Sequence, residues 1–138
     1  MAAMPTLKLE IITPQAIVFS EDVELVTLPS ADGDIGIYPQ HVRLITQLMP
    51  GEIVVSKGGT DRLLAVGEGL VDVAATHVSI LTDMAIRAED IDEAKVTEAR
   101  ERAAARLREK LSDEEVAAVN GSLVRALAQL QVRRRSHR

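Results

Sequence analysis

The amino-acid sequence predicts a β + α protein, in which an N-terminal antiparallel β-sandwich is followed by a C-terminal antiparallel two-helix hairpin. Short apolar runs with a two-residue period recur about every ten residues as far as residue 87. No proline follows Pro50, and residues 88–138 are rich in Ala, Glu, Arg and Leu, which are good helix formers. We therefore divide the chain into a sandwich domain, residues 1–87, and a helical domain, residues 88–138.

The predicted strands begin at residue 6. In TLKLEII, the apolar residues Leu7, Leu9 and Ile11 alternate with polar ones, as expected for a strand with one buried face. Seven further short runs follow, namely AIVFS, VELVTL, RLITQL, EIVVS, RLLAV, LVDVA and HVSILT. Turns rich in Gly, Pro and Asp separate them, and no helix-length segment intervenes. A parallel βαβ sheet is therefore disfavoured, and an antiparallel sandwich or barrel is predicted.

Residues 33–41, GDIGIYPQH, form the most unusual short segment of the sandwich domain. We expect Gly33 and Gly36 to permit turns with positive φ, and Pro39 to place the segment at a sheet edge or end. The resulting rigid loop would display four side chains, Asp34, Tyr38, Gln40 and His41. Two interpretations stay open at this point: a surface that another protein contacts, or an ordinary turn whose Tyr38 packs on the sandwich.

Two helices are predicted in the second part of the chain. Asp90 and Glu93 have the spacing of a capping box at a helix start, and the same spacing recurs at the second start. That second pair is Ser112 and Glu115. Acidic residues crowd both starts and basic residues both ends, which is the distribution that the helix dipole favours.

Each predicted helix carries an apolar stripe that would face the other helix. The stripes comprise Val96, Ala99, Ala103, Leu107 and Leu111 on the first helix, and Val116, Val119, Leu123, Leu127 and Leu130 on the second. Alanine buries little apolar area, and Gly121 falls within the second helix. We therefore expect a modestly stable hairpin that can exchange its internal partner for an external one.

The sequence offers almost no chemistry for an enzyme. It contains no cysteine, no phosphate-binding loop and no nucleophile elbow. His77 lies in a predicted strand and His137 near the chain end, so only Asp34 with His41 is worth weighing as an acid–base dyad or half of a metal site. A metal ion would need a third ligand, which is not found nearby in the sequence. We predict neither catalytic residues nor a metal site.

The composition also narrows the choice of partners. Residues 1–87 carry a formal charge of −6 and residues 88–138 one of +1, so the first part is unsuited to nucleic acid. The aromatic content of 1% is too low for base stacking. The basic tail RRRSHR is interpreted as a solvated chain end. There is no evident targeting peptide or uncharged apolar stretch of about 18 residues, so we predict no direct membrane insertion.

Two motifs and the architecture resemble one family, the epsilon subunit of the bacterial rotary (F-type) ATP synthase, which is called delta in mitochondria. GDIGIYPQH is similar to the family's segment G-[ED]-[LI]-G-[IV]-x-P-x-H. Residues 67–92, GEGLVDVAATHVSILTDMAIRAEDID, are similar to the family's run from a Gly-rich turn through the last strands into the helices. A small sandwich followed by an Ala- and Arg-rich hairpin extends the resemblance over essentially the whole chain.

The resemblance implies a non-catalytic accessory subunit of the proton-translocating ATP synthase. It implies a ten-stranded sandwich that docks on the gamma subunit and the c-ring and rotates with them as the central stalk, peripheral to the cytoplasmic face of the energy-transducing membrane. Contacts to gamma or the c-ring would come from Asp34, Tyr38, His41 and Arg43. The hairpin would extend along gamma and inhibit ATP hydrolysis by meeting the catalytic beta (and alpha) subunits. Its contacts would come from Arg106, Arg108, Arg133, Arg134 and Arg135.

The sequence departs from the family pattern at two places. Arg43 stands in HVRLIT, where the family has HxPLLT, and adds a charge beside the expected ring contact. Some family members bind ATP through the motif [IL]-D-x-x-R-A, at which this chain has Ile91, Asp92, Lys95 and Val96. Lysine offers a point charge instead of the planar donor fork of arginine, so we expect weak ATP binding or none, and no other cofactor.

Two alternatives outside the family stay open. The first is a β-sandwich adaptor whose helical hairpin docks in an unrelated assembly. The second is a small-molecule-binding sandwich with a helical lid, which predicts an apolar cavity and is less attractive because aromatic residues are scarce. Binding to gamma and the c-ring would separate the family interpretation from the adaptor.

Overall fold

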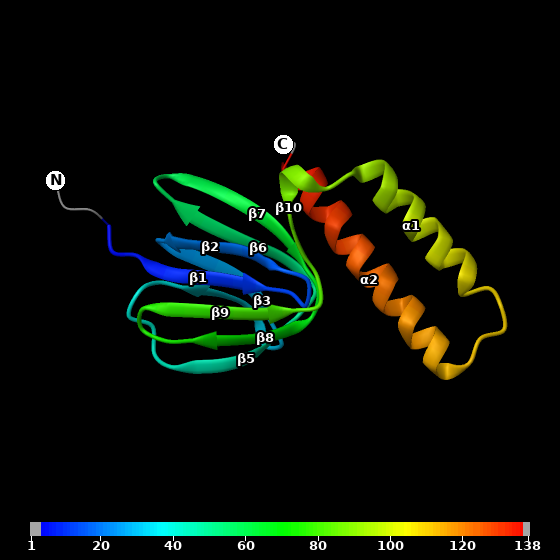
Figure 1. Cartoon of the computed structure of the whole chain (residues 1–138), viewed down its shortest axis with the longest axis horizontal. Coiled ribbons are helices and arrows are strands. Elements are labelled where there is room, and N and C mark those ends of the chain that lie inside the picture. Colours follow the sequence, from blue (N-terminus) through cyan, green and yellow to red (C-terminus); the bar gives the residue numbers. More distant parts are fainter. Residues whose placement is uncertain (1–3, 137–138) are drawn as a thin grey trace.

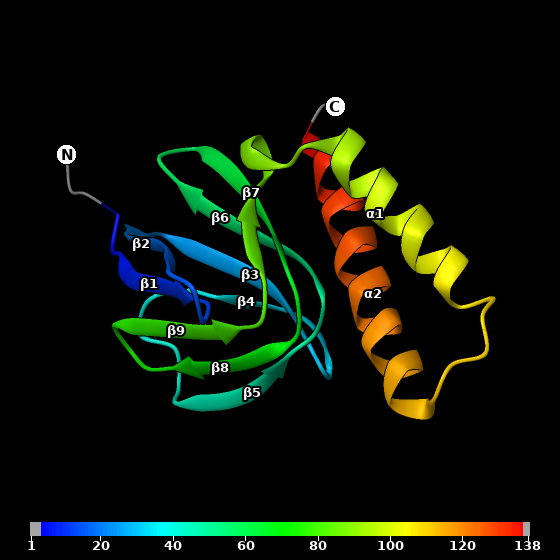
Figure 2. The same ribbon diagram turned by 45° about the vertical axis from the view of Figure 1, so that its right-hand side comes forward.

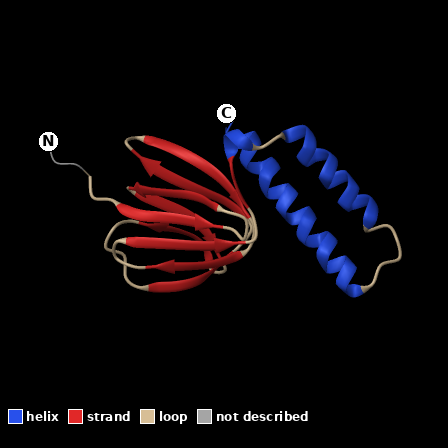
Figure 3. Cartoon of the chain, in the orientation of Figure 1, coloured by secondary structure: helices blue, strands red, loops and turns tan. Residues whose placement is uncertain are grey.

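The computed structural model describes residues 4–136 and shows a β-sandwich with a helical hairpin along one flank (Figure 1). The strands are β1 (Leu7–Ile12), β2 (Ile17–Val23), β3 (Leu25–Ser30), β4 (Gly33–Ile37), β5 (Leu44–Leu48), β6 (Gly51–Lys57), β7 (Thr60–Val66), β8 (Gly69–Val73), β9 (His77–Thr82) and β10 (Ala85–Arg87). The helices are the 3-10 turn η1 (Ala88–Asp90), α1 (Glu93–Arg106) and α2 (Asp113–Ser136). The predicted fold class is confirmed, and strands and helices occupy separate regions (Figure 3).

The ten strands form one hydrogen-bonded sheet that curls into the sandwich. Their order is β10-β7-β6-β3-β5-β8-β9-β1-β2, and β4 is added beside β3. All the pairs are antiparallel except β1 with β9, which run parallel with Leu9 opposite Val78. The expectation of antiparallel pairing throughout does not hold for this pair, because the two strands are far apart in the chain and no tight turn sets their direction.

The core between the two layers is almost entirely aliphatic. Leu7, Leu9 and Ile11 are buried, as their alternation predicts, and they pack with inward-facing residues of β3 and β6 to β9. Phe19 is the one aromatic side chain in this cluster. Each fully buried large apolar side chain contributes about 1.5–3 kcal/mol relative to an exposed one, so this core is the main source of stability.

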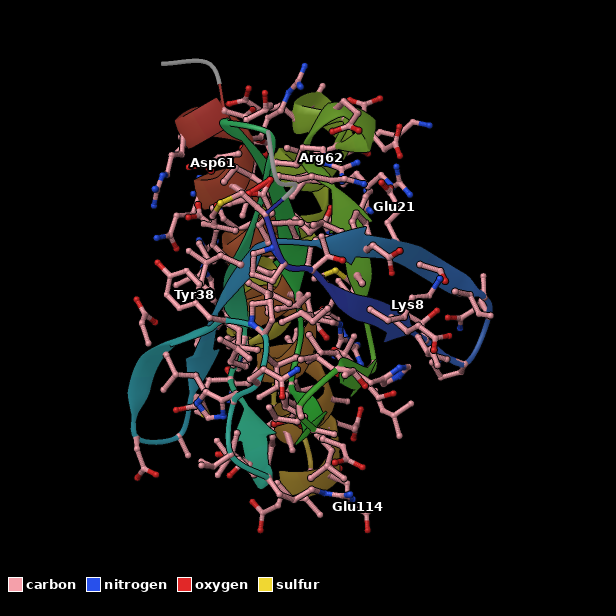
Figure 4. All side chains as sticks on the ribbon, turned by 90° about the vertical axis from the view of Figure 1, so that its left-hand side faces the viewer. Lys8, Glu21, Tyr38, Asp61, Arg62 and Glu114 are labelled. Carbon is pink, nitrogen blue, oxygen red and sulfur yellow. The ribbon has the colours of Figure 1, made fainter. Side chains whose placement is uncertain are left out.

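A polar cluster joins the two ends of the strand order. Arg62 on β7 donates two hydrogen bonds of 3.0 Å to the Glu21 carboxylate on β2, and Figure 4 shows the two side chains together. The guanidinium carbons of Arg62 and Arg87 lie 5.0 and 5.4 Å from the centroid of the Phe19 ring. Arg87 also donates to the carbonyl oxygen of Val18 (3.1 Å). The cluster therefore ties β2 to β7 and to β10, the strand that leads into the helices.

The helix α2 lies between the sandwich and α1 (Figures 1 and 2). Its C-terminal half packs on β6, β7 and η1, where Val132 is buried with Ala65 and Ala88. Leu130 in the same half is also buried. The helix α1 contacts α2 and buries Ala103. None of the helices within residues 4–136 is long and apolar enough to cross a membrane.

Of the two predicted helix starts, one is confirmed and one is wrong. The capping box of Ser112 with Glu115 is confirmed by two reciprocal hydrogen bonds of 3.2 Å. The first helix, however, is capped by Asp92 and not by Asp90; the Asp92 carboxylate accepts a bond of 3.2 Å from a first-turn amide. The reason is that Ile91 is extended and buried against β7, so the α-helix can begin only after it.

The predicted apolar stripes are only partly right. The helix α1 ends at Arg106, so Leu107 and Leu111 lie in the connection between the helices. On α2, Leu127 is 45% exposed, whereas the neighbouring Ala126 is buried. A single stripe per helix assumes a single neighbour, but α2 packs against both α1 and the sandwich, and small side chains permit this close approach.

Candidate functional site

The segment predicted to be a rigid loop begins as the edge strand β4. It pairs with β3 alone, which agrees with the edge position expected from Pro39. Gly33 has a φ of 113°, as predicted, but Gly36 lies within the strand without positive φ. The prediction for Gly36 is wrong because β4 pairs with β3 along its whole length, and this pairing holds the glycine extended.

Tyr38 leaves the end of β4 and extends away from the strands (Figure 4). Its side chain is 63% exposed, so it is displayed and does not pack on the sandwich. The chain then turns at Gln40, which has a φ of 69° and donates a hydrogen bond from its amide to the Ala75 carbonyl oxygen (2.6 Å). His41 follows, with Nδ1 2.7 Å from the Val42 carbonyl oxygen.

The four predicted contact residues lie at two places. Tyr38, His41 and Arg43 lie near the turn between β8 and β9, and the Arg43 guanidinium is 3.4 Å from the Asp72 carboxylate. Asp34 lies at the other end of β4, about 13 Å from Tyr38 by the rise of a strand. Asp34 and His41 therefore form no dyad.

The described part of the chain also contains no group of three His, Asp or Glu side chains placed to hold a metal ion. His77 Nε2 lies 3.2 Å from the Glu10 carboxylate and 2.9 Å from the Ser79 hydroxyl on the sandwich surface. His137 and the first three residues lie outside the described residues.

A row of apolar side chains crosses the outer face of the sheet over four neighbouring strands, β2, β1, β9 and β8. It consists of Ile17, Ile12, Leu81 and Leu70, which are neighbours in the strand register. Ile17 is 61% exposed, Leu81 50% and Leu70 48%. We call this set the outer apolar row. Contiguous exposed apolar side chains are typical of a surface that another protein covers.

The outer apolar row was not predicted, although the sequence carries a signal for it. In a strand with one buried face, apolar residues alternate with polar ones. The pairs Leu70-Val71 and Ile80-Leu81 break this alternation. Val71 and Ile80 are buried, so their partners must face outward and remain apolar there.

Four of the five predicted regulatory arginines are engaged within the chain. Arg133, Arg134 and Arg135 contact, respectively, the Ala88 carbonyl oxygen (3.3 Å), the Glu93 carboxylate (3.8 Å) and the Glu52 carboxylate (2.6 Å). At the hairpin tip, Arg106 lies within 3.3 Å of Glu109 and Glu115, and Arg108 is exposed. The three C-terminal arginines therefore help to hold α2 in place.

The partner of Arg135 is unusual because it is nearly buried. The Glu52 side chain is 10% exposed, against 58% for Arg135. Burial raises the pKa of the Glu52 carboxyl; the nearby Arg135 guanidinium opposes this effect and the Asp34 carboxylate adds to it. Among the described residues, Glu52 Oε2 has no hydrogen-bond partner.

The three residues predicted for a weak ATP site lie at or just before the start of α1. Ile91 is buried against β7, and Asp92 serves as the N-cap of α1. Lys95 lines a groove of about 230 Å³ between α1 and α2. A second cation in this groove, Arg125, was not selected from the sequence; it is paired with Asp83 at 3.3 Å.

The Gly-rich turn of the second motif is required by close packing. A Cβ on Gly69 would overlap the backbone carbonyl of Leu81, and one on Gly67 would overlap the Asp83 carboxylate. Asp83 in turn holds Arg125 of α2. The turn therefore shapes the end of the sandwich on which α2 rests.

The fold and these surfaces define a class of protein: a β-sandwich with an exposed apolar row that carries a helical hairpin packed on one flank. Residues 6–88 match the family model described as ATP synthase, Delta/Epsilon chain, beta-sandwich domain. Residues 89–133 match ATP synthase, Delta/Epsilon chain, long alpha-helix domain. The chain belongs to the ATP synthase delta/epsilon family.

Similar proteins agree with this assignment. The ATP synthase epsilon chain of Herpetosiphon aurantiacus is 40% identical over 126 residues, which cover 91% of this chain and 93% of the relative. That of Chromobacterium violaceum is 34% identical, with 97% and 100% covered. A chain in the mitochondrial ATP synthase of Euglena gracilis (OSCP/F1/c-ring) shares the fold, with a TM-score of 0.70, 24% identity, and coverage of 99% of this chain and 85% of that one.

Proposed function

We propose that the chain is a non-catalytic central-stalk (rotor) subunit of the F-type ATP synthase that couples the catalytic head to the c-ring and regulates ATP hydrolysis. The observation that carries this proposal is the outer apolar row, on a sandwich whose relatives are ATP synthase epsilon chains. Such a row is unfavourable in water unless a partner covers it. The family match disfavours an adaptor in an unrelated assembly.

The sandwich supplies the docking surfaces in this proposal. The outer apolar row is assigned to the gamma subunit, because a rotor contact that must not slip needs buried apolar area. The exposed Tyr38, with His41 and Arg43, forms a second contact patch for gamma or the c-ring. Asp34 lies apart from both of these surfaces, beside α2. We assign it as the acidic contact to the c-ring. This arrangement would hold the subunit peripheral to the cytoplasmic face of the membrane.

The hairpin is the regulatory element in this proposal. Val132 and arginine contacts hold it to the sandwich, and a helix pair bound in this way can leave without opening the aliphatic core. Release would free Arg133, Arg134 and Arg135 for acidic surfaces of the catalytic beta (and alpha) subunits. Arg106 and Arg108 at the hairpin tip would add to the same basic surface.

ATP binding is proposed to be weak or absent. The groove between α1 and α2 offers two cations, Lys95 and Arg125, but Asp83 already neutralises the second. Isothermal titration of the isolated chain with ATP is expected to give no saturation at submillimolar nucleotide. Saturable binding that Lys95→Ala abolishes would contradict this expectation.

Docking can be tested with two leucines of similar exposure. Leu81→Glu places a charge in the outer apolar row and is expected to weaken gamma binding at least tenfold, because the buried carboxylate would be unpaired. Leu127→Glu alters an equally exposed leucine on α2 and serves as the matched control, with binding unchanged. An equal loss of gamma binding in the two variants would show that the outer apolar row is not part of the gamma interface.

Regulation can be tested by removing the hairpin. ATP hydrolysis is measured for the catalytic complex reconstituted with the full chain or with a chain ending near Ala88. Higher hydrolysis with the short chain, in a complex of unchanged composition, is the expected result. Unchanged hydrolysis while both forms bind gamma would overturn the inhibitory role. Failure of both forms to bind would overturn the rotor assignment itself.

A further inference from the structure

The last turn of α2 lies over a groove that is dominated by carboxylates. The groove has a volume of about 570 Å³ and runs along the outer face of β3 and β6. Its charged lining residues come from four elements: Asp34 on β4, Glu52 on β6, Asp61 on β7 and Arg135 on α2. Asp61 accepts a hydrogen bond of 2.7 Å from Ser56, whereas Glu52 is held by Arg135. One cation therefore stands against three carboxylates.

The position of Glu52 makes its charge costly when α2 is docked. The side chain is nine-tenths buried, one of its oxygens has no hydrogen-bond partner among the described residues, and Asp34 lies on the same groove. Arg135 is more than half exposed, so water weakens its compensating field. Taking a carboxylate out of water can cost more than one such ion pair returns. Undocking of α2 takes the Arg135 charge away from Glu52. It also returns the Glu52 carboxylate to water, which stabilises its charged form.

We propose that Glu52 is a proton-sensitive element in the seam between β6 and α2, and that proton uptake at Glu52 tightens the docking of the hairpin. This inference deepens the proposed role of the hairpin as a movable element and rests on it. The pKa of Glu52, raised in the docked state chiefly by burial, gives the sign. A raised pKa means that the docked state binds the proton more tightly. Docking is therefore strongest below the undocked pKa and weakens as the pH rises through the docked pKa.

Hydrogen–deuterium exchange of the isolated full chain tests the proposal directly. Protection of the α2 amides, corrected for intrinsic exchange, is compared with that of β8 and β9 between pH 5 and pH 8. We expect α2 protection to rise several-fold on acidification, up to the ratio of the two acid dissociation constants, with the strands as the internal reference. Glu52→Gln is expected to raise protection at pH 8 and to flatten the pH profile. Asp22→Asn, on β2, is the matched control.

A second variant keeps the test independent of Glu52 itself. Asp34→Asn removes a carboxylate that raises the Glu52 pKa, so the profile should move to lower pH while Glu52 and Arg135 stay in place. A flat wild-type profile, protection that falls on acidification, or looser docking in Glu52→Gln would each overturn the proposal. The hydrolysis assay on the truncated chain is separate. If docking depends on pH but truncation leaves hydrolysis unchanged, the regulatory function is overturned and the proposal for Glu52 stands.

Discussion

The sandwich and the hairpin are stabilised by different means. The sandwich buries large aliphatic side chains between two layers, and residues from nine strands, β1 to β9, meet in one core. The hairpin buries Ala103, Ala126 and Ala128 together with Leu130 and Val132, and its other links to the sandwich are made by arginines. Apolar burial does not titrate with pH, whereas ion pairs depend on pH, salt and competing partners.

This difference teaches where the molecule can move. Contacts across the seam involve one side of α2, and α1 adds none of its buried residues to the sandwich core. Local opening follows the boundaries of regions with few buried apolar contacts. We therefore expect the hairpin to undock as a unit while the ten-stranded sheet stays folded, and three substitutions can break or sharpen this contrast.

The largest effect is expected from Leu9→Ala in the sandwich core. The substitution removes buried methyl groups and leaves a cavity, so it should lower the free energy of unfolding by about 2–5 kcal/mol. Urea unfolding followed by far-ultraviolet circular dichroism measures the loss. Leu127→Ala, at an exposed site on α2, is the control and should change stability by less than about 0.5 kcal/mol. Comparable losses in the two variants would refute the contrast between the regions.

A smaller and local effect is expected from Val132→Ala on α2. Val132 is buried with Ala65 of β7, so its truncation should weaken docking of α2 on the sandwich by about 1–2 kcal/mol, because two buried methyl groups are lost and undocking relieves the cavity. Limited proteolysis should then cut α1 and α2 faster while the sandwich fragment persists. Faster cleavage within β8 or β9 would instead show that hairpin and sandwich unfold together.

Much of the fold was predictable because strand periodicity and helix propensity are local signals. The alternation of Leu7, Leu9 and Ile11 predicted a buried face that the structure confirms. The β1–β9 pair was not predictable, because parallel pairing between distant segments leaves no local trace. The start of α1 was missed for a related reason: Ile91 is held extended by contacts with β7, and tertiary packing overrides a capping pattern.

The candidate sites were predicted less completely than the fold. The sequence placed Asp34, Tyr38 and His41 in one segment, and a loop would have kept them together, but strand β4 separates Asp34 from the others. Glu52 carried no signal at all, because its environment is created by α2, which lies about 80 residues further along the chain. Side chains that acquire their properties from distant elements are beyond the reach of local patterns.

The smallest effect is expected in the polar cluster that joins β2 to β7. Its pH dependence is opposite in direction to that proposed for the hairpin. The Arg62 hydrogen bonds hold the pKa of Glu21 below its usual value of 4.5. A lowered pKa contributes stability above the unfolded value, and the contribution is lost as the pH falls through the folded pKa, the opposite of the behaviour proposed for Glu52. Both side chains are 36% exposed, so Arg62→Met should cost less than about 1 kcal/mol after screening.

This prediction is checked by urea unfolding of the wild type and Arg62→Met at pH 7 and at pH 3. Methionine keeps an apolar stem beside Phe19, so the comparison isolates the charge. The difference between the two proteins should be present at pH 7 and should shrink as the pH falls through the folded pKa of Glu21. A difference that is unchanged between these pH values would show that Arg62 acts through packing alone. In that case acid would not destabilise the sandwich through Glu21, and only the docking of α2 over Glu52 would depend on pH.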